Sequence, residues 1–315
     1  MWKYMDKKKC NEFLLSLNLI DDNNLTDKEK LNKIYSISNN IENNYKIHKI
    51  RKRNGKFRTI YEPNYILKNI QRKILINILN NKKISKYAKA YHKDINLIDN
   101  ALPHLNKKYI LKLDIENFFD NINFLDIYNS CFPIEYFPKS IGMLLTYLCT
   151  YNDYLPQGAP TSAYISNLVM KDFDEQIGKF CEKNNISYTR YSDDMTFSCD
   201  TNPKFIIEQV RKLLSKLGLE INNDKIHIIT NNNRQYVTGI VVNEKIQVPN
   251  NYRKKIRQEI YYIKKYGIDS HLKFLNCDNK QKYLSSLYGR INYVLQINKD
   301  DKEFIEYKKY IKELI

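Results

Sequence analysis

Two separated acidic segments carry the residues of this sequence that are best suited to chemistry. Asp193 and Asp194 are adjacent in the segment 190–198, RYSDDMTFS, and Asp114 lies near the end of the apolar segment 109–115, YILKLDI. An aspartate pair by itself is common at turns. A carboxylate at the end of a buried strand, however, carries a large desolvation cost unless a cation neutralises it. If the two segments adjoin, three carboxylates converge, and their mutual repulsion calls for metal ions.

Carboxylate oxygens are hard ligands and suit Mg²⁺, with Mn²⁺ as an alternative ion. Two such ions about 4 Å apart would clamp the attacking and leaving oxygens of a phosphoryl transfer. The sequence therefore predicts a two-metal site at Asp114, Asp193 and Asp194. The prediction requires residues that lie 79 positions apart (193 minus 114) to meet in space.

Short strands are predicted to position these carboxylates. Residues 186–191 and 195–199 have strand-forming composition and place the aspartate pair at the turn between them, while 109–115 is predicted to be a buried strand. The pair Asn54-Gly55 lies inside the alternating basic segment 46–63 and predicts a hairpin. Strands mixed with helices indicate an α+β fold, with a sheet domain followed by a helical one.

Helical periodicity surrounds the predicted strands. Residues 11–50 are expected to form short helices, with Thr26 as the N-cap of one of them. Apolar residues recur on one helical face at 67–81 and again at 161–181, which is expected to be one long helix after Pro160. A further helix is expected beyond Tyr252, apolar on one side and basic on the other.

The composition favours a polyanionic partner. The 315 residues include 52 lysines and arginines against 35 acidic residues, a formal net charge of +17, which fits nucleic acid, with a membrane surface as the competing interpretation. The longest apolar run, 140–151, is shorter than the ~18 residues of a spanning helix, and no cleavage site follows the N-terminal patch. A cytoplasmic protein without membrane contact is therefore expected. The six cysteines are scattered, so neither a zinc site nor a disulfide framework is predicted.

Seven segments, in order along the chain, resemble those of reverse transcriptases, most closely the small bacterial retron type. The box at 191–194, YSDD, is similar to the family's Tyr-x-Asp-Asp box, and Asp114 with Phe118-Phe119 resembles its first carboxylate segment. The other matches are Lys52, Gly55, Arg58, Pro63, Leu67, Lys68, Gln71 and Arg72 of the fingers, the element 100–104 (NALPH), the turn 155–162 (LPQGAPTS), the segment 218–222 (GLEIN) with Lys225, and 237–239 (VTG) with Val242 and Asn243. Ala163 and Ser192 depart from the usual pattern, and neither change removes a ligand.

The resemblance implies roles at the catalytic centre. Asp114 and Asp193 would be shared metal ligands, with the backbone carbonyl of Ile115 completing one ligand shell and Asp194 more peripheral. Lys225 would protonate or neutralise the pyrophosphate leaving group. These implied catalytic and metal-binding residues extend the two-metal site predicted from the aspartates themselves.

The resemblance also implies a nucleotide site. Phe119 would exclude a 2′-hydroxyl and select deoxynucleotides, although a core phenylalanine is an equally good interpretation. The other residues expected to bind the incoming nucleotide are Lys52, Arg58, Gln157 and Gly158. Lys52 and Arg58 are also compatible with solvated charges in a basic hairpin, and 160–162 is also compatible with a simple helix start.

Eight residues are expected to contact RNA or to shape the surface that does: Asn100, His104, Val237, Thr238, Gly239, Arg253, Lys254 and Arg257. A-form RNA is recognised mainly through its backbone and 2′-hydroxyls, so lysine and arginine interleaved with tyrosine are the expected residue types. A lone histidine is more often a hydrogen-bonded structural residue, and any single lysine of the last helices is equally compatible with a solvated surface.

The resemblance implies a right-hand polymerase architecture, with N-terminal helices and fingers at 1–108, a palm at 109–240 carrying a fingers insertion around 125–165, and a helical thumb at 241–315. Such an RNA-directed DNA polymerase would use dNTPs to copy its cognate structured non-coding RNA into single-stranded msDNA, priming from a guanosine 2′-hydroxyl. The resemblance further implies a role in antiphage defence. The implied protein partners are a separate effector protein and host ribonuclease H. The alternatives are a non-retron defence reverse transcriptase and a non-catalytic RNA-binding scaffold.

Overall fold

A computed structural model of the chain describes residues 5–51, 55 and 57–315. The chain forms two compact units, and each is built from segments that are distant in the sequence. The first unit contains the residues up to Lys93, Lys112–Met195 and Lys204–His227, and the second contains Asp94–Leu111, Thr196–Pro203 and Ile228–Ile315. Both units combine helices with strands, so the predicted α+β class is confirmed.

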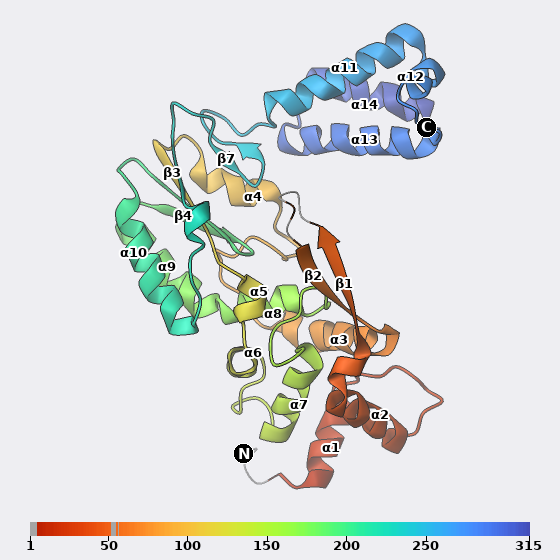
Figure 1. The fold of residues 1–315 in the computed structure, drawn as a ribbon, viewed down its shortest axis with the longest axis vertical. Helices are drawn as coiled ribbons and strands as arrows, with labels where there is room; N and C mark the ends of the chain where they lie inside the picture. The colour runs from red at the N-terminus through yellow and green to blue at the C-terminus, as the bar shows by residue number, and fades with distance from the viewer. Residues whose placement is uncertain (1–4, 52–54, 56) are drawn as a thin grey trace. The chain divides into compact units, whose positions relative to one another are not determined.

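Most of the secondary-structure elements of the first unit are helices (Figure 1). They are α1 (Lys7–Ser16), α2 (Asp27–Asn39), α3 (Tyr65–Asn77), α5 (Phe118–Asn121), α6 (Phe124–Cys131), α7 (Lys139–Cys149), α8 (Ser162–Val169), α9 (Lys171–Lys183) and α10 (Lys204–Leu214). Helix α7 packs against α1, α2, α3 and α6, and α9 packs against α10. Thr26 caps α2 through a capping box with Glu29, as predicted.

A two-stranded antiparallel hairpin follows α2, formed by β1 (Tyr45–Arg51) and β2 (Phe57–Pro63). Its register pairs Tyr45 with Pro63 and Arg51 with Phe57, so the hairpin predicted over 46–63 is confirmed. Gly55, in the connection, has a φ of +83°, a conformation that glycine adopts without steric cost.

The strands around the aspartates belong to a four-stranded sheet of order β4-β5-β3-β6. These strands are β3 (Tyr109–Asp114), β4 (Ser187–Tyr191), β5 (Asp194–Cys199) and β6 (His227–Thr230). The three strands predicted from the sequence are therefore present. The two inner strands, β3 and β5, run from one unit into the other, and Asp114 and Asp194 lie at strand ends that belong to the first unit.

The long helix predicted over 161–181 is wrong as a single element, because the chain forms α8 and α9 with Met170 between them. Met170 has a ψ of −1°, away from the helical value near −42°. Asp172 and Asp174 then lie in the first turn of α9, where acidic side chains favour a new helix N-terminus.

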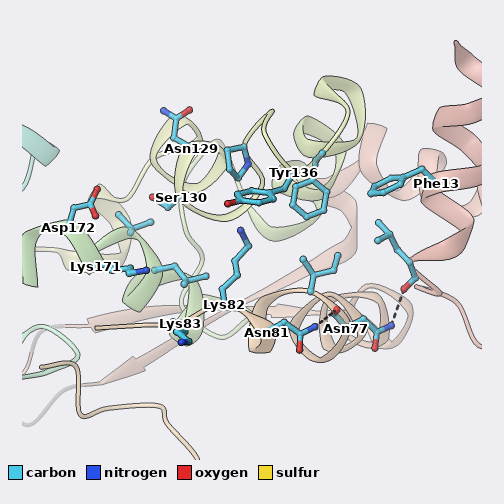
Figure 2. Close-up of a pocket in the computed structure, with 16 residues that line it drawn as sticks. Phe13, Asn77, Asn81, Lys82, Lys83, Asn129, Ser130, Tyr136, Lys171 and Asp172 are labelled. Carbon is cyan, nitrogen blue, oxygen red and sulfur yellow. Dashed lines mark hydrogen bonds between the residues drawn. The ribbon is translucent and has the colours of Figure 1, made fainter. Parts of the chain in front are cut away.

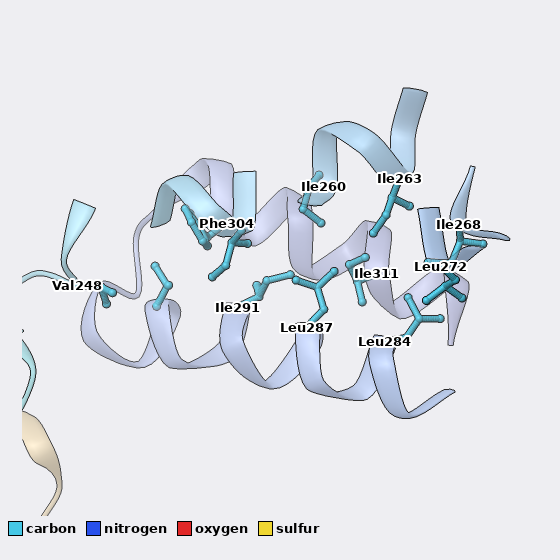
Figure 3. Close-up of a cluster of buried hydrophobic side chains, with 12 residues drawn as sticks. Val248, Ile260, Ile263, Ile268, Leu272, Leu284, Leu287, Ile291, Phe304 and Ile311 are labelled. Carbon is cyan, nitrogen blue, oxygen red and sulfur yellow. The ribbon is translucent and has the colours of Figure 1, made fainter. Parts of the chain in front are cut away.

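The second unit contains α4 (Leu97–Ala101), α11 (Asn250–Tyr266), α12 (Ile268–Phe274), α13 (Lys280–Ile297), α14 (Lys302–Leu314), β7 (Tyr236–Val237) and β8 (Ile240–Val241). Helices α11, α12, α13 and α14 share one apolar core, in which Ile260, Leu287 and Ile291 are almost fully buried (Figure 3). A smaller cluster joins α4 to the β7–β8 hairpin. None of the helices in the described residues is both long and apolar enough to span a membrane.

Candidate active site

Backbone hydrogen bonds bring three distant segments of the first unit together. The amide of Ile115 donates to the carbonyl of Asp193 at 3.1 Å, which joins the end of β3 to the turn before β5. The amide of Asn222 donates to the carbonyl of Asp114 at 2.8 Å. The amide of Glu116 donates to the carbonyl of Glu220 at 2.9 Å. The end of β3 therefore lies between the aspartate turn and the segment that leads to Lys225.

The three carboxylates influence one another electrostatically. Asp114 is 7% exposed. Burial raises the pKa of Asp193, and the Asp114 carboxylate acts in the same direction. Burial also raises the pKa of Asp194, with further contributions from the charges of Asp193 and Asp114. A raised carboxyl pKa means that the negative charge is unfavourable in the folded protein, so this cluster favours a nearby cation.

One such cation belongs to the protein itself. Lys225, at the end of a 3₁₀ helix (Asn223–Lys225), places its Nζ 2.7 Å from Asp114 Oδ1. Partial burial opposes its protonation, but the hydrogen bond to Asp114 and the charges of the three aspartates together raise the pKa of Lys225. Lys225 is therefore a protonated donor at the aspartate cluster.

Lys112 is a second lysine of this site, and sequence reasoning missed it. Burial lowers its pKa, and the Asp194 charge opposes that shift. A signal was present in the sequence, because residues two apart on a strand share a face, and Lys112 precedes Asp114 by two positions in β3.

The aspartate oxygens of this site are chemically suited to bind a divalent cation. Carboxylate oxygens are the ligands that Mg²⁺ and Mn²⁺ prefer, and burial, together with the charges of the neighbouring aspartates, raises the pKa of Asp193 and of Asp194. Within residues 5–51, 55 and 57–315, no three histidine, cysteine or acidic side chains are arranged so that they could hold an ion. Lys225 is the cation bound to Asp114 in this arrangement.

A fully buried ion pair lies behind the aspartate turn. Arg190 and Asp174 are both 0% exposed, and the guanidinium donates to the carboxylate through Nε at 2.9 Å and Nη2 at 2.7 Å. The Tyr188 hydroxyl donates to the same carboxylate at 2.8 Å. Arg190 Nη1 donates to the carbonyl of Ser192 at 2.9 Å. Arg190 therefore connects α9 to the residue directly before Asp193.

Ser192 has a backbone conformation that requires such support. Its φ is +62°, in the left-handed region that is rare for residues other than glycine. The Tyr91 hydroxyl donates to Ser192 Oγ at 3.1 Å, while Arg190 donates to its carbonyl. Sequence reasoning missed Arg190, although the arginine preceding the acidic box was a visible signal.

The 155–162 turn contacts the β1–β2 hairpin through its backbone. The amide of Tyr61 donates to the carbonyl of Gln157 at 2.7 Å. Gly158 has a φ of +122°, and a Cβ added there would lie 2.8 Å from the Tyr61 carbonyl oxygen. Both the backbone conformation and the close approach therefore require glycine at this position. The Ser162 hydroxyl donates to the Pro156 carbonyl at 2.6 Å and closes the turn.

Replacing Gly158 with alanine is expected to lower the free energy of unfolding by ~2–4 kcal/mol, since strain and a backbone clash combine. Gly218→Ala is the matched control, because Gly218 also has a positive φ, +65°, but nothing lies within 4 Å of its added Cβ. Its expected loss is ~1 kcal/mol. Urea unfolding followed by circular dichroism measures both, and equal losses would contradict the close-contact explanation.

The other predicted nucleotide-site residues differ in their surroundings. Phe118 is 3% exposed and belongs to the core, whereas Phe119 is only partly buried, with its ring 5.4 Å from that of Phe118. Arg58 is exposed on β2. Lys52 lies outside the described residues. The structure thus leaves part of Phe119 accessible, which a fully buried core residue would not be.

Two of the predicted RNA-contacting segments meet inside the second unit. Asn100 and His104 are 1% and 0% exposed, and His104 Nδ1 lies 2.7 Å from Ser198 Oγ. Asn100 Nδ2 donates to Thr238 Oγ1 at 3.3 Å. Thr238 and Gly239 form the turn between β7 and β8 with φ values of +46° and +83°, and Val237 is buried beneath them. Asn100, His104 and Val237 are therefore buried, whereas Thr238 is partly buried and Gly239 is exposed.

The arginines predicted to contact RNA form ion pairs within the second unit. Arg253 Nη2 lies 2.5 Å from Asp301 Oδ2, and Arg257 bonds both oxygens of Glu303 at 2.7 and 2.6 Å. Both arginines therefore join α11 to the start of α14. Lys254 is exposed on α11, so it is the residue of the three whose charge is most accessible.

Comparison with known proteins identifies the class of protein that this site belongs to. Residues 50–284 match the family described as reverse transcriptase (RNA-dependent DNA polymerase). The chain therefore belongs to the reverse transcriptases, and it is an RNA-directed DNA polymerase of α+β polymerase fold.

The retron type is shown by individual relatives. The chain is 31% identical over 224 residues to the retron Ec86 reverse transcriptase of Escherichia coli. This alignment covers 70% of this chain and 70% of that one. It is 34% identical over 241 residues to the retron Ec83 reverse transcriptase of Escherichia coli, covering 70% of this chain and 76% of that one. Among solved structures, an apo telomerase from Candida Tropicalis, truncated from its C-terminal domain, is similar with a TM-score of 0.47 and 16% identity, covering 66% of this chain and 55% of that one.

Proposed function

We propose that the chain copies its cognate structured non-coding RNA into single-stranded DNA at a two-metal site formed by Asp114, Asp193, Asp194 and the carbonyl of Ile115. The observation that carries this proposal is the hydrogen bond from Ile115 to Asp193, which joins the two acidic segments. Two Mg²⁺ ions, or Mn²⁺ in their place, would supply Lewis-acid stabilisation of the attacking and leaving oxygens. RNA template and dNTPs are the substrates that follow from the family.

The protein's own groups have distinct tasks in this proposal. Asp114 and Asp193 would bind the metal cations, and Asp194 would lie more peripherally. Lys225, protonated beside Asp114, would move to the pyrophosphate leaving group and neutralise or protonate it. Phe119 would lie under the sugar and exclude a 2′-hydroxyl. Gln157 and Gly158 would approach the nucleotide through side chain and backbone, with Lys52 and Arg58 neutralising the triphosphate.

The architecture that fits these tasks is a right hand. The residues 1–108 would form the N-terminal helices and fingers, 109–240 the palm with a fingers insertion around 125–165, and 241–315 the thumb. The basic face of α11, with Lys254 exposed on it, would follow the RNA–DNA duplex. The buried residues Asn100, His104 and Val237 would then shape the RNA-binding surface from within, and Thr238 and Gly239, in the turn between β7 and β8, would lie at that surface.

Priming is proposed to follow the retron pattern. The enzyme would extend the 2′-hydroxyl of a guanosine in its own RNA, so that the DNA copy stays branched to the template as msDNA. An antiphage role in the cytoplasm, a separate effector protein and trimming by host ribonuclease H complete this proposal. It is supported by retron relatives at 31% and 34% identity.

Co-expression of the chain with its flanking RNA tests this function. Nucleic acid that copurifies with the protein is expected to contain DNA, and debranching enzyme is expected to shift its mobility. A DNA product that debranching leaves unchanged would favour a non-retron defence reverse transcriptase. Deoxynucleotide incorporation by the purified protein should also stop with a chelator and return with Mg²⁺, and RNA binding without incorporation would leave only a non-catalytic scaffold.

A further inference from the structure

A cavity of about 1060 Å³ lies in the first unit, and its lining contains none of the residues assigned above to the catalytic centre. Its walls come from the end of α1, the end of α3, the end of α6, the segment before α7 and the junction of α8 with α9. Figure 2 shows Lys82 extending into this cavity toward the ring of Tyr136. Sequence reasoning assigned no catalytic or binding role to any residue of this lining.

The cavity carries an excess of positive charge. Lys82, Lys83 and Lys171 line it together with a single carboxylate, Asp172. In the described part of the chain, none of the three lysines forms an ion pair. Burial lowers the pKa of Lys82, Cys131 opposes that shift, and the charge of Lys171 adds to it. An anion in the cavity would relieve this repulsion.

The position of Lys82 is fixed by the surrounding structure. Its amide donates to the Leu79 carbonyl at 2.9 Å, and its carbonyl accepts from the Tyr164 hydroxyl at 2.8 Å. Its Nζ lies 5.3 Å from the centroid of the Tyr136 ring and 5.9 Å from that of Phe137. These cation–π contacts hold the ammonium inside the cavity without neutralising it.

The same wall offers an aromatic surface. Tyr136 is 67% exposed, so much of its ring is available for stacking even though Lys82 contacts it. Asn129 and Ser130 add hydrogen-bonding groups to the lining. Lysines that neutralise phosphate, combined with an aromatic ring that stacks on a base, are the means by which proteins hold unpaired nucleotides. The volume is also large enough for a nucleotide-sized ligand.

We propose that this cavity is a second nucleic-acid site, which binds a nucleoside phosphate with its phosphate at Lys82 and Lys171 and its base against Tyr136. The nucleoside phosphate comes from an unpaired segment of RNA or from a free nucleotide, since both present the same chemistry. This site goes beyond the polymerase function and does not depend on it.

Photocrosslinking locates such a site directly. The full-length protein is irradiated with a 5′-phosphorylated RNA pentamer that contains 4-thiouridine, without deoxynucleotides, and the crosslinked peptides are identified by mass spectrometry. A crosslink to the peptide that contains Tyr136 is expected. The double variant Lys82→Gln/Lys171→Gln should reduce its yield at least about tenfold, because two charge-assisted contacts are lost. The charge-matched control Lys28→Gln/Lys216→Gln, at two exposed lysines, should not change it.

Aromatic variants keep the test independent of folding defects. Tyr136→Ala should reduce binding of the pentamer to the cavity, whereas Tyr136→Phe should retain it, because stacking needs the ring and not the hydroxyl. Suppression of the crosslink by excess ATP would show that a free nucleotide also occupies the site, and no suppression would restrict it to RNA. Absence of the Tyr136 crosslink, or equal yields from the lysine double variant and its control, would overturn the proposal.

Discussion

Replacing Asp193 with asparagine is expected to reduce deoxynucleotide incorporation by at least ~10³-fold, because a carboxylate that would hold the catalytic metal ions is lost. Stability should change in the opposite direction. Burial and the Asp114 carboxylate raise the pKa of Asp193 in the folded protein. An aspartate with a raised pKa costs folding free energy at neutral pH, where it is ionised. The neutral asparagine removes that cost, so the thermal midpoint should stay equal or rise.

Metal binding gives this variant a second readout. If Asp193 is a metal ligand, adding Mg²⁺ or Mn²⁺ should raise the thermal midpoint of the wild-type protein, because a ligand that binds only the folded state stabilises it. The Asp193→Asn protein should respond much less. Asp278→Asn makes the same chemical change at an exposed loop position, and it should leave activity and the metal response unaltered. Full incorporation by Asp193→Asn would remove the basis of the two-metal proposal.

The second large effect is expected from Arg190→Met. This change leaves the Asp174 carboxylate fully buried without its cation. Removing one partner of a buried ion pair costs about 3–5 kcal/mol, and the urea midpoint should fall accordingly. Arg234→Met, at an exposed position, is the control, and its effect should stay within about 0.5 kcal/mol.

A double-mutant cycle separates the ion pair from general packing. Arg190→Met combined with Asp174→Leu removes both charges, so the double variant should be clearly more stable than Arg190→Met alone. Its incorporation rate should nevertheless stay below that of the wild type, because the Ser192 carbonyl has still lost the Arg190 donor. If stability and rate recover together, Arg190 acts only through folding and does not position the turn that carries Asp193.

Much of the local structure could be predicted from neighbouring residues. The β1–β2 hairpin follows from an Asn-Gly pair in an alternating segment, and the α2 capping box from Thr26 and Glu29. The strand β3 was visible as a short apolar run, and β4 and β5 were visible from their strand-forming composition. The helix predicted over 161–181 failed because periodicity reports a shared buried face, which α8 and α9 can provide with a break at Met170 between them.

What the sequence determined by itself was the inventory of the site: its aspartates, its turns and the family that their order indicates. The tertiary structure alone decided which groups meet. It pairs Lys225 with Asp114, 111 positions away, and Arg190 with Asp174 and the Ser192 carbonyl. It also buries His104 and directs Arg253 and Arg257 into ion pairs within the second unit. The physical reason is range, because turns and caps are formed by residues a few positions apart, whereas burial and charge pairing depend on chain segments that only the complete fold brings together.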